Sequence, residues 1–184
     1  MTNGTEIETE RLCLRPFTPE DVDAVHRLWT DKDVRRYIWD DEAIPRERAA
    51  AVIDESRRLF ESEGFGLWAA SPRAEDALIG FCGYWYFHEP PELQLLYGLA
   101  PASWGRGLAA EAARAMIRFG FEELSLDRVV ASADAPNEAS FRVMEKAGMT
   151  FEKRVLMNDR DTVYYAITRE EFRPDDSTYV LRRL

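Results

Sequence analysis

The sequence has few of the residues that bind metals or cross-link a chain. Its 184 residues include two cysteines and two histidines. Cys13 and Cys82 each lie in an apolar run without CxxC spacing, and His26 and His88 are far apart in sequence. We therefore expect no metal site. We also expect both cysteines to be buried small side chains of a protein in a reducing compartment, the cytoplasm.

Long apolar runs and a cationic N-terminal segment are also absent. The mean hydropathy is −0.40, and no apolar run approaches the ~20 residues that span a bilayer. The opening residues, MTNGTEIETERLCLRPF, lack the positive start and the apolar block of a signal peptide. We expect neither a membrane span nor a signal peptide.

Basic residues are fewer than acidic ones. Lys and Arg together number 24 against 34 Asp and Glu, which gives a net charge of −10 and a pI of about 4.8. A negative field of this size repels nucleic acids and anionic membranes and mildly attracts cationic partners such as amines. We therefore expect neither a nucleic acid nor a membrane as partner.

The length and composition fit one domain over residues 1–184. Domains usually contain about 100–200 residues, and a chain this long buries enough surface to form a core without metal or disulfides. An aromatic content of 12% and nine scattered prolines exclude a disordered chain, a collagen-like repeat and a coiled coil.

Apolar periodicity predicts an α/β fold with a mixed, mostly antiparallel central sheet flanked by helices. Three successive strands have connections too short for a crossover helix and should pair antiparallel, and a strand–helix–strand crossover follows them. The expected strands are Ile7–Phe17, Phe65–Ala70, Leu78–Phe87, Leu93–Leu99, Arg128–Ala133, Thr150–Met157 and Thr162–Ile167, the last two joined by a turn at Asn158–Asp161. Four helices are expected. The first begins at Thr18, the second runs from about Pro45 to Glu63 and ends before Gly64, and the other two cover Gly107–Leu124 and Pro136–Ala147.

The segment that follows the third of these antiparallel strands carries the clearest chemical signal. Pro101 stops strand pairing, and Gly105 and Gly107 open a helix. Main-chain N–H groups at a helix N-terminus, together with the helix dipole, favour a phosphate or diphosphate, and Arg106 adds a charge that can reach the same anion. The alternative is an ordinary glycine-containing loop before a helix.

The same glycines match a loose dinucleotide fingerprint. Gly105-x-Gly107-x-x-Ala110 is followed about twenty residues later by Asp127. That fingerprint belongs to the first unit of a parallel sheet, whereas this loop follows an antiparallel meander. A nicotinamide-dependent oxidoreductase is therefore a weak alternative. The absence of GxxxxGK[ST] disfavours a nucleoside triphosphatase.

A second polar segment begins at Asn137, just after a predicted strand. Ser140 lies one turn further along the next helix, so both side chains should face one opening. The Asn137 amide can bind an amide-bearing ligand, and the Ser140 hydroxyl is close to it. The alternative is that Asn137 only caps the helix and Ser140 is a small surface residue.

Together these segments resemble the GCN5-related N-acetyltransferase (GNAT) superfamily, in particular the branch of ribosomal-protein N-terminal acetyltransferases (RimJ/RimL type). The resemblance covers roughly Glu6 to Phe172 and leaves 173–184 as a C-terminal tail. The matching motifs are Thr9-Glu-Arg-Leu-x-Leu-Arg-Pro16, Trp104-Gly-Arg-Gly-Leu-Ala-x-Glu-Ala112, Asn137-x-x-Ser140 and Met144-Glu-Lys-x-Gly-Met149.

The resemblance implies acetyl-CoA as donor and a primary amine as acceptor, with no metal. It implies that the diphosphate lies on the main chain of Gly105–Ala110 and that the pantetheine arm lies between two splayed parallel strands, Leu93–Leu99 and Arg128–Ala133. The cofactor-binding residues expected in this way are Leu99, Trp104, Gly105, Arg106, Gly107, Leu108, Ala109, Ala110, Asn137 and Ser140.

The chemistry requires a neutral amine, and an α-amine or a lysine amine must lose a proton first, because their pKa values are about 7.7–8 and 10.4. The N–H of Leu99 can polarise the thioester carbonyl, and no acyl-enzyme on a cysteine is required. Family members often carry a tyrosine where this chain has Met144, so Ser140 becomes the candidate acid. They also carry a glutamate where it has Gln94, so Glu92 becomes the candidate base. Asp134 or a water relay is the alternative base.

Three questions stay open at the level of sequence. A degenerate acetyltransferase domain that senses CoA or binds a partner is the alternative to an active enzyme. The oligomeric state is undecided, with a homodimer the commonest assembly. The acceptor is also undecided, although an aromatic and acidic wall for a cation is one interpretation of a helical segment that otherwise packs on the sheet. Its residues are Trp29, Tyr37, Ile38, Trp39, Asp40 and Asp41.

Overall fold

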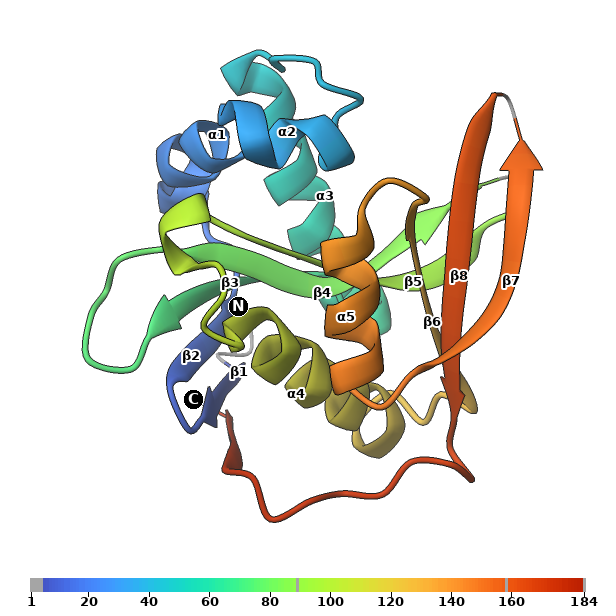
Figure 1. Cartoon of the computed structure of the whole chain (residues 1–184). Coiled ribbons are helices and arrows are strands. Elements are labelled where there is room, and N and C mark those ends of the chain that lie inside the picture. Colours follow the sequence, from blue (N-terminus) through green and yellow to red (C-terminus); the bar gives the residue numbers. More distant parts are fainter. Residues whose placement is uncertain (1–4, 89, 158, 184) are drawn as a thin grey trace.

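The computed structural model describes residues 5–88, 90–157 and 159–183, and its elements follow the predicted order (Figure 1). The strands are β1 Thr5–Thr9, β2 Leu12–Pro16, β3 Leu67–Pro72, β4 Gly80–Phe87, β5 Glu92–Leu99, β6 Arg128–Asp134, β7 Thr150–Met157, β8 Arg160–Thr168 and β9 Tyr179–Arg183. The helices are α1 Val22–Thr30, α2 Lys32–Ile38, α3 Arg46–Glu63, α4 Leu108–Glu122 and α5 Glu138–Lys146. Short 3-10 turns precede α1 and α4.

The strands form two antiparallel sheets rather than one continuous sheet. One has the order β5-β4-β3-β2-β1-β9 and the other the order β6-β8-β7. β5 and β6 are edge strands of different sheets that lie side by side, yet they are not hydrogen-bonded neighbours in either sheet as described. The predicted α/β fold with flanking helices is thereby confirmed. The two central strands that were expected to splay apart, β5 and β6, belong to separate sheets.

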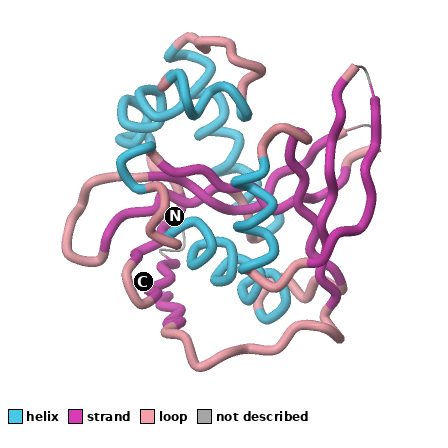
Figure 2. Tube along the Cα trace, viewed as in Figure 1, coloured by secondary structure: helices cyan, strands magenta, loops and turns pink. Residues whose placement is uncertain are grey.

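Two apolar layers cover the two faces of the larger sheet, as Figure 2 shows by the helices on both sides of its strands. Because side chains alternate along a strand, Ala69 and Phe81 pack towards α1 and α3, whereas Trp68 and Tyr84 pack towards α4. The Tyr84 hydroxyl donates to the carbonyl of Met116 on α4 at 2.8 Å. These contacts fix α4, and therefore the loop at its N-terminus, against the sheet.

Both ends of the chain differ from the prediction. Ile7–Phe17 is not one strand, because the charged pair Glu10-Arg11 turns the chain and β1 pairs antiparallel with β2. The expected C-terminal tail, 173–184, contains β9, which pairs with β1 from Thr5↔Arg183 to Thr9↔Tyr179. The hairpin of β7 and β8 is present, although Asn158 of its predicted turn lies outside the described residues.

The helix boundaries follow local chemistry. Thr18 precedes the first turn as predicted, and the carboxylate of Asp21 accepts from its N–H at 2.8 Å. α3 begins one residue after Pro45 and ends at Gly64, whose φ of +81° is the left-handed conformation that glycine tolerates. α2 is a separate short helix that the sequence did not distinguish from α1.

The two cysteines are both free thiols, but only one is fully buried. Cys82 is 0% exposed, as predicted, whereas Cys13 is half-buried, so the expectation for Cys13 was wrong. Burial raises the pKa of both thiols, and the charges of Glu6 and Glu8 add to the effect at Cys13. Across the part of the chain that the structure describes, no helix is both long enough and apolar enough to cross a membrane.

Candidate functional site

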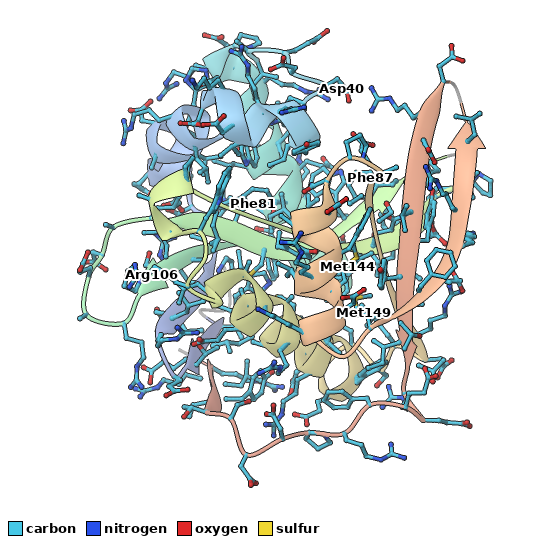
Figure 3. The ribbon with its side chains drawn as sticks, viewed as in Figure 1. Asp40, Phe81, Phe87, Arg106, Met144 and Met149 are labelled. Carbon is cyan, nitrogen blue, oxygen red and sulfur yellow. The ribbon has the colours of Figure 1, made fainter. Side chains whose placement is uncertain are left out.

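The loop before α4 presents its main chain to solvent. Gly105 and Gly107 have φ values of +71° and +77°, and the first helical hydrogen bond runs from the N–H of Glu111 to the carbonyl of Gly107 at 3.1 Å. The N–H groups of residues 108–110 therefore have no acceptor within the helix. Arg106 is exposed at the same loop (Figure 3). This end of α4 can bind a diphosphate by main-chain donors, the helix dipole and one guanidinium.

Arg11, in the turn between β1 and β2, holds this loop in place. Its guanidinium donates to the main-chain carbonyl of Arg106 at 2.8 Å and to the carboxylate of Glu111 at 2.7 Å. Glu111 also accepts from the Thr9 hydroxyl at 2.6 Å and from the Arg11 N–H at 2.8 Å. Burial alone would raise the pKa of Glu111, but these hydrogen bonds and the charge of Arg11 lower it overall.

The residues of this network all belong to the sequence motifs described above. Thr9, Arg11 and Glu111 all lie within the quoted motifs, but the bond between two motifs 100 residues apart is visible only in the fold. The network explains why a turn at the start of the chain matters for a helix in its second half.

The end of β5 is open toward β6. The N–H of Ala100 donates to Ile79 at 2.8 Å, and main-chain groups alternate in direction along an antiparallel strand. The N–H and carbonyl of Leu99 therefore point away from β4, into the break between the two sheets. The carbonyl accepts from Nε1 of Trp104 at 2.7 Å, which joins the glycine loop to β5. The N–H of Leu99 is directed as a thioester-polarising donor requires.

A chain of polar side chains crosses the break between β5 and β6. The Ser132 hydroxyl on β6 donates to Oε1 of Gln94 at 2.7 Å, and Nε2 of Gln94 donates to the carboxylate of Glu92 at 2.7 Å. Gln94 is 2% exposed, so its amide is fixed by two partners in a buried position. An amide cannot act as a base, so Gln94 is not the base itself. It instead orients the carboxylate of Glu92, the candidate base.

A second carboxyl lies at the end of β6. Partial burial raises the pKa of Asp134, the charge of Arg160 opposes this and that of Asp40 adds to it. Asp40 and Arg160 form an ion pair between the end of α2 and β8, and Figure 3 shows Asp40 on the side of the helices that faces the hairpin of β7 and β8. A raised pKa makes a carboxylate a stronger base, so Asp134 remains an alternative base.

Asn137 and Ser140 lie at the start of α5, as predicted. The Asn137 side chain accepts from the N–H of Ser140 at 3.3 Å, so it caps the helix. The Ser140 hydroxyl lies 2.7 Å from the hydroxyl of Tyr97 on β5. Met144, one turn further on, is 0% exposed in the core between α4 and α5 and β5. The Tyr97 hydroxyl on β5 thus reaches α5, where the buried side chain is that of Met144 and has no hydroxyl. Tyr97 adds a hydroxyl to the candidate site that the sequence did not indicate.

The expected aromatic wall is mainly core. Trp29 is 1% exposed and packs edge-on against Phe17, Trp39 and Phe81. It cannot present its ring to a ligand, so for Trp29 the packing alternative is correct. The sequence left both interpretations of Trp29 open because aromatic residues at helical spacing serve a core and a binding surface equally well.

The remaining residues of that segment lie over β5 or at its margin. Ile38 covers β5, since its Cδ1 would lie 3.2 Å from a Cβ placed on Gly98. Asp40 and Asp41 are exposed, and Asp41 pairs with Arg35 at 3.0 Å. The guanidinium of Arg36 lies over the ring of Tyr37, 5.2 Å from the ring centroid. The acidic part of the predicted wall is therefore accessible, although Asp40 and Asp41 are already paired with arginines.

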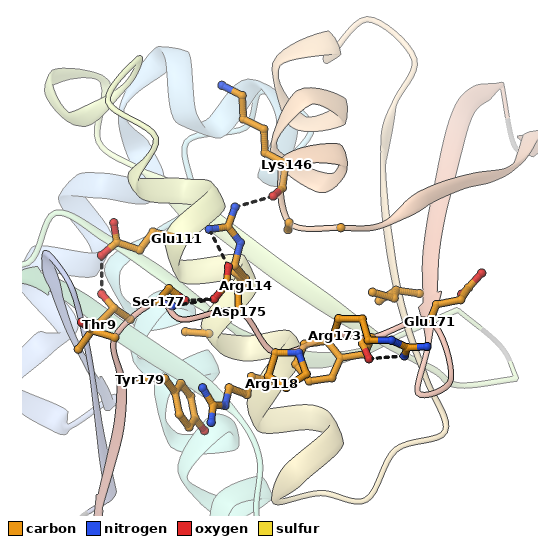
Figure 4. Close-up of a pocket in the computed structure, with 17 residues that line it drawn as sticks. Thr9, Glu111, Arg114, Arg118, Lys146, Glu171, Arg173, Asp175, Ser177 and Tyr179 are labelled. Atoms are coloured by element: carbon orange, nitrogen blue, oxygen red, sulfur yellow. Dashed lines mark hydrogen bonds and ion pairs between the residues drawn. The ribbon is translucent and has the colours of Figure 1, made fainter.

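A cavity of about 320 Å³ lies elsewhere (Figure 4), lined by α4, the end of α5 and the segment 171–179. No predicted cofactor or catalytic residue is among its lining residues. Arg114 donates to the carbonyl of Lys146 at 2.7 Å and pairs with Asp175 at 3.6 Å. These bonds join the C-terminal segment and the end of α5 to α4, so the cavity belongs to a structural joint.

Comparison with known proteins identifies the family. Residues 11–150 match the model of the acetyltransferase (GNAT) domain. The chain is 31% identical over 172 residues to the N-acetyltransferase YnaD of Bacillus subtilis, covering 90% of this chain and 98% of YnaD. It is 30% identical over 187 residues to the FsC-acetyl coenzyme A-N(2)-transacetylase of Aspergillus fumigatus, covering 90% and 77%. The crystal structure of a GNAT-family acetyltransferase from Bacillus anthracis superposes with a TM-score of 0.76 at 28% identity, covering 90% and 99%.

The fold and the comparisons define an enzyme of the acyltransferase class. The chain belongs to the GNAT acetyltransferase family. The nicotinamide alternative, which depended on the spacing of two glycines, is thereby wrong.

Proposed function

We propose that this enzyme transfers the acetyl group of acetyl-CoA to a primary amine, either a protein N-terminus or a small-molecule amine, by direct attack in a ternary complex. The observation that carries the proposal is that an open α4 N-terminus occurs together with a Leu99 N–H that points away from β4 at the edge of the sheet. The first suits a diphosphate and the second suits an amide-bearing arm that ends in a thioester. The name of the Aspergillus fumigatus relative, an acetyl coenzyme A transacetylase, supports this donor, and the name of YnaD supports transfer of an acetyl group to nitrogen.

In this proposal the main chain binds the coenzyme. The N–H groups of Gly105–Ala110 and the side chain of Arg106 hold the diphosphate, while Trp104 fixes the loop to β5. The pantetheine arm enters the break between β5 and β6. The N–H of Leu99 donates to the thioester carbonyl as negative charge develops there. Nδ2 of Asn137, which its capping bond does not use, donates to a pantetheine carbonyl.

Side chains from separate elements carry the proton transfers. Glu92, held by Gln94, takes the proton that the amine must lose. The amine then attacks the carbonyl carbon, the carbon–sulfur bond breaks, and Ser140 protonates the departing thiolate. Cys82 takes no part, because it is fully buried and holds its proton.

The choice of acceptor follows charge and motif. The net charge of −10 favours a cationic amine. The motifs Thr9–Pro16 and Asn137-x-x-Ser140 favour the branch of ribosomal-protein N-terminal acetyltransferases. We further propose a single domain over residues 1–184, acting in the cytoplasm, with a homodimer the commonest assembly.

Two measurements test the proposal. Calorimetry with CoA should give a dissociation constant in the range of about 1 μM to 1 mM that is typical of enzyme substrates, and no uptake at millimolar CoA would overturn it. Release of CoA from acetyl-CoA should then accelerate with members of a panel of N-terminal peptides, polyamines and amino acids. Binding without turnover across the panel would favour the second candidate, a CoA sensor, which the buried Met144 supports because it removes one hydroxyl from α5.

A further inference from the structure

Tyr97 and Ser140 form a hydroxyl pair across the break between the sheets. Tyr97 projects from β5 and Ser140 from the first turn of α5, which follows β6. The Tyr97 hydroxyl is 2.7 Å from the Ser140 hydroxyl and 3.0 Å from the Ser140 carbonyl oxygen. The two hydroxyls therefore lie on the α4 and α5 side of β5, where the N–H of Leu99, two residues from Tyr97, is also directed to the break.

The number of protons in this pair allows two arrangements. Each hydroxyl has one proton and two lone pairs. When Tyr97 donates to the Ser140 carbonyl, the Ser140 hydroxyl can donate to Tyr97, and the pair is closed. When Tyr97 donates to the Ser140 hydroxyl instead, the proton of Ser140 is free to point at a third atom in the break. A sulfur atom that arrives there would select the second arrangement.

The opposite face of β5 carries the other half of the chemistry. Glu92 and Gln94 alternate with Tyr97 in strand position, and Gln94 contacts Ser132 on the face of β6 that carries Val130 rather than the face that carries Val129. The candidate base and the hydroxyl pair are therefore separated by the strand itself. The amine and the sulfur can each meet their own proton carrier without the two carriers exchanging a proton directly.

We propose that Tyr97 is a positioning residue that aims the Ser140 hydroxyl at the sulfur of the coenzyme and resupplies its proton. This inference rests on the proposed function. The carbon–sulfur bond breaks as the carbon–nitrogen bond forms, and the thiolate takes the proton of Ser140. Ser140 takes that of Tyr97, and Tyr97 regains one from water. The proton lost by the amine leaves through Glu92, so one proton leaves and one arrives for each turnover.

The protonation state of Tyr97 agrees with this role. Burial raises its pKa and the hydrogen bond from Ser140 lowers it less, so the net pKa lies above the usual range. The phenol is therefore neutral at physiological pH and carries the proton it must supply. A phenol with a raised pKa gives up its proton only to a strong base, and the thiolate expelled from the thioester is the base that forms in the break.

Single-turnover acetyl transfer tests the pair by a double-mutant cycle. We expect Ser140→Ala to slow transfer about 100-fold, as loss of a general acid does, and Tyr97→Phe to slow it about 10-fold. Because Tyr97 acts through Ser140, the double variant should be no slower than Ser140→Ala. Ser140→Thr, which keeps a hydroxyl, should restore most of the rate. CoA affinity by calorimetry should stay within about twofold for Tyr97→Phe, because the Tyr97 hydroxyl is held by Ser140 and has no part in coenzyme binding.

The leaving group separates proton supply from a merely structural role. A selenol is more acidic than a thiol and leaves without a proton, so the loss caused by Tyr97→Phe should largely disappear with the acetyl selenoester of CoA. Tyr86→Phe, which removes another tyrosine hydroxyl on the neighbouring strand β4, is the matched control and should be silent with both donors.

Three results would overturn the inference. They are a Tyr97→Phe enzyme as fast as the wild type, a loss that adds to that of Ser140→Ala, and an equal loss with both donors. None of these would touch the proposed function, which fails only if the wild-type protein neither binds CoA nor transfers acetyl.

Discussion

The two ends of the break between β5 and β6 are built in different ways. At the glycine loop the donors are main-chain N–H groups, and the side chains of Arg11 and Glu111 hold them from behind. At the other end Glu92, Gln94 and Ser132 use their own side chains, each from a different position on two sheets. A site built from main-chain groups depends on the conformation of the loop, whereas a site built from side chains depends on which residues are present. The first end should therefore control affinity for the coenzyme and the second the rate and the choice of amine.

The largest effect should come from the acceptor end. Glu92→Gln removes the proposed base, and we expect acetyl transfer to slow about 100-fold with unchanged CoA affinity, measured by stopped-flow CoA release and calorimetry. Glu75→Gln, an exposed carboxyl in a loop, is the control. Turnover near that of the wild type across pH would remove Glu92 from the mechanism and direct the same test to Asp134→Asn.

The cofactor end should give the opposite result. Gly107→Val places a β-branched residue at a φ of +77°, which costs about 1–3 kcal/mol. The loop should leave its conformation, and calorimetry should show CoA binding weakened about 10- to 100-fold. Gly64→Val puts the same strain at a φ of +81° at the end of α3 and should lower thermal stability without changing CoA affinity. Equal affinity in both variants would contradict the proposed diphosphate site.

A smaller loss of rate is expected when Glu92 keeps its carboxylate but loses Gln94, the residue that orients it. Gln94→Leu leaves Glu92 in place but removes its buried donor, and a hydrogen bond to a charged group contributes about 1.5–3 kcal/mol. We expect transfer to slow about tenfold, with CoA affinity unchanged and the effect reduced in a Glu92→Gln background. Full additivity of the two variants would show that Gln94 does not act on Glu92.

The smallest effect concerns stability. Because the pKa of Glu111 is lowered in the folded state, its contribution is complete above the ordinary glutamate pKa of about 4.3. It is lost as pH falls through the lower folded value. Glu111→Gln should lower the melting temperature at pH 7 by about 2–4 °C, for about 1 kcal/mol, and the difference from the wild type should shrink below about pH 4. A difference that is constant from pH 3 to 7, measured by scanning calorimetry, would contradict this assignment.

The sequence predicted the parts of the molecule that local chemistry determines. The glycine loop follows from two glycines before an alanine-rich helix, and the end of α3 follows from Gly64. The elements from α3 to β8 follow the predicted order for the same reason, whereas the break at Glu10-Arg11, the separate helix α2 and the strand β9 were not predicted. The roles of individual site residues, including Glu92 and Ser140, stay predictions until the variants above are measured.

The rest depended on contacts between distant segments. Arg11 reaches Glu111 across 100 residues and Ser132 reaches Gln94 across 38, and no periodicity encodes such pairs. β9 was missed because a short strand rich in charge has the composition of a tail. The two interpretations of Trp29, ligand wall or core, could not be separated from the sequence because burial, not residue type, decides whether an aromatic ring meets a ligand.

Because β9 pairs with β1, the last residues of the chain support a part of the molecule that lies near its start. β1 ends at Thr9, next to the turn whose arginine grips the glycine loop, so the final strand braces that turn from the opposite edge. A deletion that stops after Phe172 would keep every residue of the proposed coenzyme site and still remove the strand that supports the turn holding the loop. The last strand is thereby a distant support for the proposed coenzyme loop.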